Sequence, residues 1–266
     1  MQLVLSLFPG IGMLDMAFEM EGFTVVRGPD VLWGGDIRTF HVPAGRFDGL
    51  IGGPPCQMFS SLAHMVRHNG FKTKFGNLIP EFERVISEAQ PTWWLMENVP
   101  QAPLPSVLGY EAWSCKLDNR QLGEVQRRIR RWTFAAREKT VLQIETVALM
   151  NQKFSYAACG GGGSGGVGLA TVDKFGRGGR PKSVKELRSK QRLDSCVGSN
   201  IKSSVAFRAL CRAQGLPDDF ELPPFKIESA CKAIGNGVPI AMGRAIAAAV
   251  RLATNKGTAN GTEATS

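Results

Sequence analysis

The sequence predicts an α/β protein with a doubly wound, mostly parallel β-sheet and a small basic insert. Two observations carry this prediction. Between Leu3 and Pro100, short apolar segments of strand length alternate with segments of helical periodicity, which favours βαβ units and a parallel sheet. Polar residues rarely interrupt the apolar segments, as expected of strands buried on both faces.

The predicted elements follow in a regular order. The first apolar strand runs into a glycine-containing turn and then a helix that stops at Gly22. A helical pattern returns from about Phe207 and leads into a final helix rich in small residues. We expect strands at 3–8, 24–27, 48–51 and 93–96, and helices at 13–20, 78–89 and within 230–253.

The composition bounds the class of protein. With 266 residues, 43% of them hydrophobic, the chain can bury a large core. A net charge of +9 and a pI near 9.5 favour a polyanionic partner. The six cysteines form no Cys-x-x-Cys pair, which argues against a zinc site or a disulfide framework. No uninterrupted apolar run reaches the ~18 residues of a membrane span. We therefore expect a cytoplasmic protein without membrane or metal.

Cys56 is the most informative residue in the chain. Two prolines precede it, and each fixes φ near about −65°, so the thiol sits on a backbone with little freedom. The apolar segment before the prolines ends in two glycines, like a parallel strand that runs out into a loop. Ligands of open α/β sheets bind at this carboxyl edge. The residue types leave two interpretations open, a nucleophilic thiol or a small buried hydrophobic residue.

Other candidate residues also follow predicted strands. The turn at 8–12 fits the cradle of a nucleotide-like cofactor, but also an ordinary βα turn. Asp30 stands where an acid accepts hydrogen bonds from ribose hydroxyls, and Asp36 follows it; either also fits a loop cap. Glu97 ends an apolar strand, where a partly desolvated carboxylic acid can donate a proton to a substrate. A salt bridge or a helix cap is the alternative for Glu97.

The segment 126–131 is rich in arginine. On a strand, Gln126, Arg128 and Arg130 would share one face. Three polar groups aimed the same way can hold an oxyanion or a phosphate. A solvated basic edge is the alternative.

Six motifs occur in one order along the chain. They are Phe-x-Gly-x-Gly, Gly-Pro-Pro-Cys-Gln, Glu-Asn-Val, Gln-x-Arg-x-Arg, Arg-x-Gln-Gly-Leu-Pro-Asp-Asp-Phe and Gly-Asn-Gly-Val-Pro. In this order they resemble the DNA (cytosine-5) methyltransferase family over residues 1–134 and 207–252. The resemblance implies the Rossmann-like fold of S-adenosylmethionine-dependent methyltransferases, with transfer of a methyl group to C5 of cytosine in double-stranded DNA.

The resemblance also implies catalytic roles. The thiolate of Cys56 would attack C6 of a flipped-out cytosine. Glu97 would hydrogen-bond N3 of the base, and Arg130 would reach O2 with support from Arg128. Substrate contacts are expected from Gln57, Ser60 and Gln126.

The implied cofactor is S-adenosylmethionine. Asp30 would meet its ribose, and Asp36 with Ile37 would meet its adenine. The full set of expected cofactor contacts is Phe8, Gly10, Ile11, Gly12, Asp30, Asp36, Ile37, Pro54, Leu78 and Asn236.

We expect three parts in the chain. Residues 1–134 and 207–253 would form the catalytic and cofactor-binding domain, 135–206 a small target-recognition region, and 254–266 a disordered tail. The recognition region contains a glycine-rich loop at 159–168, and residues 171–202 carry nine basic residues against three acidic ones. Basic residues bind DNA phosphates independently of the base sequence, so we expect a short or relaxed recognition sequence.

Two alternative functions stay open. One branch of the family methylates tRNA, but it usually carries Cys-Phe-Thr after its glutamate motif, and this chain lacks that tripeptide. The other alternative is a catalytically silent DNA-binding homologue, although Cys56, Glu97 and Arg130 are all present. We expect a monomer that either belongs to a restriction-modification pair or acts as a solitary methylase.

Overall fold

The structure, a computed structural model, describes residues 1–56, 59, 76–124, 126–147, 155–156, 204–223 and 225–255. The chain divides into two compact units. The first comprises Met1–Leu117, Ile129–Glu145 and Met242–Ser266, and the second comprises Asp118–Arg128 and Thr146–Ala241. The domain boundaries predicted from the sequence separate a catalytic from a target-recognition function, whereas these units are defined by compactness. The predicted domain boundaries therefore stay a prediction.

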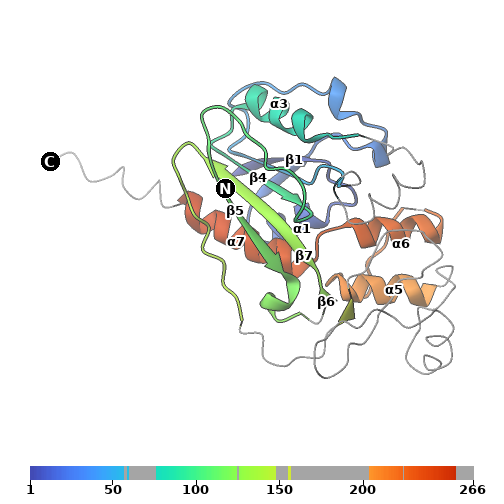
Figure 1. Cartoon of the computed structure of the whole chain (residues 1–266). Helices are drawn as coiled ribbons and strands as arrows, with labels where there is room; N and C mark the ends of the chain where they lie inside the picture. Colours follow the sequence, from blue (N-terminus) through green and yellow to red (C-terminus); the bar gives the residue numbers. More distant parts are fainter. Residues whose placement is uncertain are drawn as a thin grey trace. The chain divides into compact units, whose positions relative to one another are not determined.

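The first unit is built on a six-stranded sheet (Figure 1). Its order is β2 (Thr24–Arg27), β1 (Leu3–Leu7), β3 (Gly49–Gly52), β4 (Trp93–Asn98), β7 (Ile129–Ala136) and β5 (Glu111–Asp118). β1 pairs in parallel with β2 and β3, and β3 pairs in parallel with β4, whereas β4 and β7 are antiparallel. The predicted doubly wound, mostly parallel fold is confirmed.

The strand order reverses between β1 and β3. Helix α1 (Met13–Met20) leads from β1 to β2 on one side of this point, and α3 (Ile79–Ala89) leads from β3 to β4 on the other. The residues that follow β1 and β3 therefore leave the sheet at its topological switch point, where ligands of open α/β sheets usually bind.

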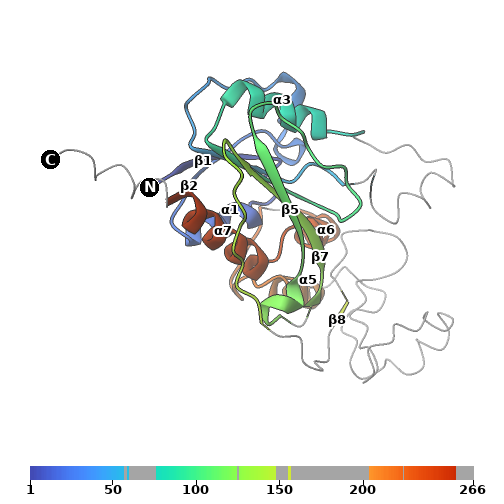
Figure 2. The ribbon, with the colours of Figure 1, turned by 60° about the vertical axis from the view of Figure 1, so that its left-hand side comes forward.

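Helices cover both faces of the sheet (Figure 2). The indoles of Trp93 and Trp94 point to opposite faces, because consecutive strand residues alternate. Trp94 meets Phe82 of α3 edge-on, with ring centroids 6.0 Å apart. Trp93 stacks on Phe18 of α1 at 6.4 Å and on Phe134 of β7 at 6.1 Å. The central strand β4 is thus buried between aromatic side chains on both faces, which explains its apolar sequence.

Gly49 makes the packing of Trp93 possible. The two residues are register partners on β3 and β4, and the indole lies over the glycine. A Cβ atom at Gly49 would stand 2.1 Å from Cζ2 of Trp93.

The carboxyl-terminal helix α7 (Ile240–Asn255) joins the first unit from Met242 onward. It ties the two ends of the chain together, because Nε2 of Gln2 donates to Oγ1 of Thr254 at 2.8 Å. Nε of Arg244 also donates to Oε1 of Glu21, just after α1, at 2.9 Å. The run Ser229–Asn255 is long and apolar enough to cross a membrane by length and composition, but 61% of its apolar 18-residue window is buried, as in a core helix.

Two predictions about elements were wrong. The tail was placed too early, since Thr254 and Asn255 belong to α7; residues 256–266 lie outside the described residues. The segment 126–131 is not one strand. β6 (Gln126–Arg127) pairs with β8 (Ser155–Tyr156) in a separate two-stranded sheet, and β7 begins at Ile129.

The remaining elements are the helices α5 (Ser204–Ala213) and α6 (Ile227–Asn236) and the short 3₁₀ helices η1 (Val31–Trp33), η2 (Ile37–Thr39) and η3 (Asn119–Leu122).

Candidate active site

Glu97 and Arg130 form an ion pair at the end of β4. The register pairs Glu97 with Trp132 of β7, and Arg130, two residues before Trp132, points to the same face. Nε of Arg130 lies 2.7 Å from Oε1 of Glu97, and the two side chains are only 18% and 14% exposed. Arg131 instead donates from Nη1 to the carbonyl of Ala102 at 2.8 Å. The pair thus presents an acidic and a basic group together in a place that water screens little.

The loop that carries Cys56 lies against the same strand end. Nδ2 of Asn98, the residue after Glu97, donates to the carbonyl of Pro54 at 3.1 Å. A Cβ atom at Gly53 would stand 3.2 Å from Oε2 of Glu97. The carbonyl of Cys56 accepts a hydrogen bond from the backbone N–H of Phe59 at 2.9 Å, which turns the chain just after the thiol. The structure therefore brings Cys56, Glu97 and Arg130 to one edge of the sheet.

The other described cysteines are poor nucleophile candidates. Desolvation by burial raises the pKa of the Cys115 thiol to about 11. Burial also raises the pKa of Cys211 and of Cys231. Because the thiolate is the nucleophilic form, these three thiols are unreactive near neutral pH. Cys56 is half-buried, at the edge of the sheet where ligands bind.

The turn after β1 has the shape of a ligand cradle. Phe8, Gly10 and Gly12 all have left-handed φ angles, of 56°, 56° and 81°. Such a φ is uncommon for a bulky residue and marks Phe8 as strained, as residues at ligand sites often are. A Cβ atom at Gly10 would meet nothing within 4 Å, so space for a ligand adjoins the turn. Two side chains fix the backbone of Gly10. Asp30 accepts a hydrogen bond from the N–H of Gly10 at 2.8 Å, and Trp33 donates from Nε1 to the carbonyl of Gly10 at 2.6 Å.

A polar cluster around the buried Asp15 supports the turn. Gly12 approaches the guanidinium of Arg27 closely, since a Cβ atom there would lie 2.9 Å from Nη2. Arg27 donates from Nε to Asp15 at 3.0 Å, and Ser6 donates from Oγ to the other oxygen of the same carboxylate at 2.5 Å. Desolvation raises the pKa of Asp15, and these two hydrogen bonds oppose the rise. The cluster fixes the start of α1 to β1 and β2.

Two carboxylates near the turn fit a nucleoside-bearing cofactor. Asp30 caps η1 by accepting from the N–H of Leu32 at 2.8 Å, and Asp36 caps η2 by accepting from the N–H of Arg38 at 3.0 Å. Both residues are thus loop caps, the alternative that the sequence left open. A carboxylate has about four lone-pair sites, so each retains capacity for a hydroxyl or amino group. Open space beside Gly10 and the spare acceptor of Asp30 next to it match a sugar, and Asp36 offers a further acceptor for a base.

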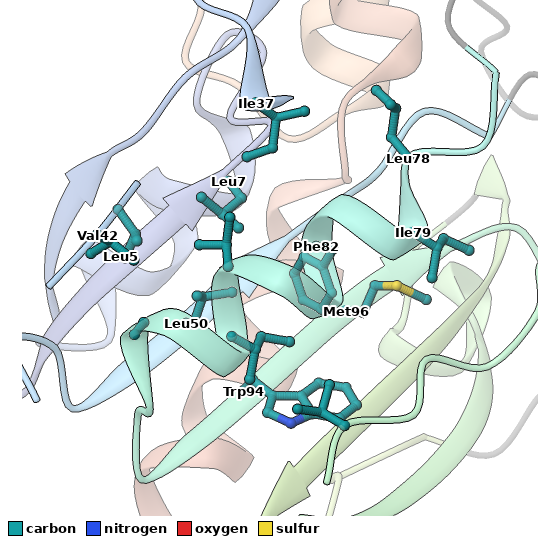
Figure 3. Packing of buried hydrophobic residues seen from close by; sticks show 14 of the residues in the cluster. Leu5, Leu7, Ile37, Val42, Leu50, Leu78, Ile79, Phe82, Trp94 and Met96 are labelled. Atoms are coloured by element: carbon teal, nitrogen blue, oxygen red, sulfur yellow. The ribbon is translucent and has the colours of Figure 1, made fainter. Parts of the chain in front are cut away.

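Three predicted cofactor contacts belong to one apolar cluster or pack against it, and Figure 3 shows two of them, Ile37 and Leu78. Ile37 and Leu78 are buried in it, and Phe8 packs against it. The side chain of Ile37 is only 3% exposed, so its backbone is the part that can reach a ligand. Pro54 is buried as well, with its carbonyl already bound to Asn98.

In the second unit, Arg128 has a role that sequence reasoning missed. It is buried, and its guanidinium donates to the carbonyls of Gly235 at 3.1 Å and Gly237 at 2.7 Å. The side chain therefore holds the turn at the end of α6, where the predicted cofactor residue Asn236 lies. The sequence held one general indication of this role, because the last carbonyls of a helix need hydrogen-bond donors from outside it. Gln126 is buried in the same unit, and Gln57 and Ser60 lie outside the described residues.

Within the part of the chain that the structure describes, no group of three or more His, Cys, Asp or Glu side chains is arranged to hold a metal ion.

Comparison with known proteins identifies the family of the chain. The family model for C-5 cytosine-specific DNA methylase matches residues 33–105. The type II methyltransferase M.FnuDI of Fusobacterium nucleatum is 33% identical over 114 residues, which are 36% of this chain and 32% of that relative. The chain thus spans about one third of M.FnuDI. The type II methyltransferase M.HgiGI of Herpetosiphon aurantiacus is 31% identical over 124 residues, 39% of this chain and 94% of that relative.

A solved structure extends the likeness to the fold. The S. pombe Dnmt2 methyltransferase superimposes with a TM-score of 0.62 at 14% identity, over 96% of this chain and 99% of that one. The resemblance drawn from the six motifs is confirmed. The chain belongs to the C-5 cytosine-specific DNA methylase family.

Proposed function

We propose that this protein transfers a methyl group from S-adenosylmethionine to C5 of cytosine in double-stranded DNA. The Glu97–Arg130 ion pair, which lies against the loop of Cys56 at the switch point of the sheet, carries the proposal. The open glycine turn after β1 supports a cofactor site next to it. Membership of the methylase family points to the same reaction.

In the proposed reaction, the sulfur of Cys56 bonds to C6 of the base, and C5 becomes nucleophilic. Glu97 donates a proton to N3, and Arg130 donates a hydrogen bond to O2 and holds Glu97 in place. S-adenosylmethionine would supply the electrophilic methyl group that C5 takes and would leave as S-adenosylhomocysteine. Loss of the C5 proton then restores the double bond and expels the thiolate, and N3 returns its proton to Glu97, which leaves 5-methylcytosine and free Cys56.

The cytosine must leave the duplex for this chemistry, because a thiol cannot reach C6 inside stacked DNA. We propose that Gln57 and Ser60 contact the extruded base, and that the region 135–206 grips phosphates and reads a short or relaxed sequence. Arg128 is buried and donates to the carbonyls of Gly235 and Gly237, so we propose that it positions the end of α6 rather than touches the base. We propose that Gln126 contacts the substrate. We also propose a monomer that acts in the cytoplasm.

Incubation with methyl-labelled S-adenosylmethionine tests the function directly. We expect label in double-stranded DNA and none in tRNA, followed by a base-resolution map that shows methylated cytosines at a short motif. Label in tRNA alone would favour the RNA-methylating alternative, and DNA binding without label would favour the silent homologue. A strict site of six or more base pairs would contradict the expected relaxed recognition.

Arg130→Lys is expected to lower kcat by about 100-fold, the usual cost of one donor aimed at a developing charge. A lysine ammonium lacks the planar fork of arginine, so it cannot both pair with Glu97 and reach a second acceptor. Single-turnover methylation measures the effect. Arg131→Lys is the matched control, because that neighbouring guanidinium binds the carbonyl of Ala102 instead. Equal losses in both variants would contradict the assigned role.

A further inference from the structure

Arg84 of α3 has not been assigned to the site so far, yet its guanidinium contacts the segment that contains the predicted cofactor residue Ile37. Nη2 donates to the carbonyls of Ile37 at 2.7 Å and Phe40 at 3.0 Å. Nε donates to Glu81 at 2.8 Å, and Nη1 donates to Glu88. All three nitrogens of the group are thus engaged, and two of the four partners come from a distant segment of the chain.

The two carbonyls belong to the segment that begins at Asp36. η2 starts after Asp36, and Ile37 and Phe40 stand at its beginning and just past its end. The side chain of Ile37 anchors this segment in the core from one side. Arg84 anchors its backbone from the other, because carbonyls that end a short helix need external donors. These two anchors fix where the carboxylate of Asp36 and the N–H of Ile37 stand.

The two glutamates keep Arg84 in this orientation. Burial opposes the charge of Glu88, but hydrogen bonds from Arg84 and His41 outweigh it and lower the pKa of Glu88. Glu88 therefore stays ionised near neutral pH, and it lies one helical turn after Arg84, with Glu81 one turn before. Held by a carboxylate on each side, the planar guanidinium directs Nη2 at the two carbonyls.

We propose that Arg84 is a positioning residue that sets the adenine-recognition segment Asp36–Ile37 without touching the cofactor. This inference rests on the proposed function, since it assumes that S-adenosylmethionine binds beside the glycine turn. It adds a specific consequence: loss of Arg84 weakens recognition of the 6-amino edge of the base, and leaves the rest of cofactor binding in place.

Calorimetric titration with two ligands tests this. One is S-adenosylhomocysteine, and the other is S-inosylhomocysteine, in which a carbonyl oxygen replaces the 6-amino group. In Arg84→Gln we expect about tenfold weaker binding of the adenosyl ligand, the effect of one charged hydrogen bond, and little change for the inosyl ligand. The preference between the two ligands therefore shrinks. Arg244→Gln is the matched control, because it removes an arginine that hydrogen-bonds Glu21 instead of Ile37 and Phe40, and we expect it to retain the preference.

The possible results distinguish failure of the inference from failure of the proposed function. Equal weakening of both ligands in Arg84→Gln would indicate general damage and overturn the inference, as would unchanged affinities. A wild-type protein that binds neither ligand would overturn the proposed function, and the inference with it, before any variant is compared. If Arg84→Gln does not fold, Arg84→Lys gives the same test, because lysine keeps a charge for the glutamates and loses the forked donor.

Discussion

Replacing Cys56 with alanine is expected to abolish methyl transfer, with kcat lowered by about 10⁴-fold or more, as for other covalent nucleophiles. The cause is chemical: C5 of cytosine is nucleophilic only while a sulfur is bonded to C6. DNA binding and folding should change little, because the side chain is small and half-buried. Single-turnover assays with labelled cofactor measure the loss, and gel shifts measure the binding.

Cys115→Ala serves as the control for this variant. Burial raises the pKa of Cys115 to about 11, so that thiol stays protonated and activity should be unchanged. DNA containing 5-fluorocytosine gives a second readout, since a fluorine at C5 blocks the elimination step and leaves the enzyme covalently trapped. The wild type should form this stable adduct and Cys56→Ala should not. Methylation by Cys56→Ala would overturn the mechanism.

Gly49→Ala is expected to lower the free energy of unfolding by about 3 kcal/mol, the upper part of the range for overpacking a core. The added methyl group would stand 2.1 Å from the indole of Trp93. That ring cannot turn away, because Phe18 and Phe134 stack against it. Urea unfolding followed by circular dichroism measures the change.

A double-mutant cycle identifies the cause of this destabilisation. Trp93→Phe removes the benzo part of the indole, which supplies the atoms nearest to the added methyl group. Gly49→Ala should therefore cost much less in the Trp93→Phe background than in the wild type. Additive effects of the two substitutions would show that the methyl group destabilises the sheet in another way.

The sequence predicted the first half of the fold closely, for a physical reason. Strands buried on both faces must be apolar throughout, so 93–96 and 48–51 stood out, and α1 matched its predicted bounds, Met13–Met20. The helix 78–89 was recognisable from its amphipathic period, and it begins one residue later than predicted. The sequence pattern was enough to predict an element wherever the burial of that element determined its own pattern of apolar residues.

Roles that depend on distant partners could not be predicted in this way. Arg128 looked like one of three aligned polar groups, but its acceptors lie more than a hundred residues away at the end of α6. The pairing of Arg84 with Glu81 and Glu88 follows from their spacing on one helix, whereas its contact with Ile37 depends on the tertiary fold. The ion pair of Glu97 with Arg130 likewise required the register of β4 and β7.

The hydrogen bond from Asn98 to Pro54 has a consequence for how such enzymes can be altered. It joins the ends of two adjacent strands through a fully buried amide, so the segment with the nucleophile and the segment with the acid behave as one rigid piece. A graft that shifts the backbone at Pro54, or that replaces Asn98, would break this hydrogen bond. Chimaeras should therefore exchange both loops together, and a tolerated change in one is expected to require a matching change in the other.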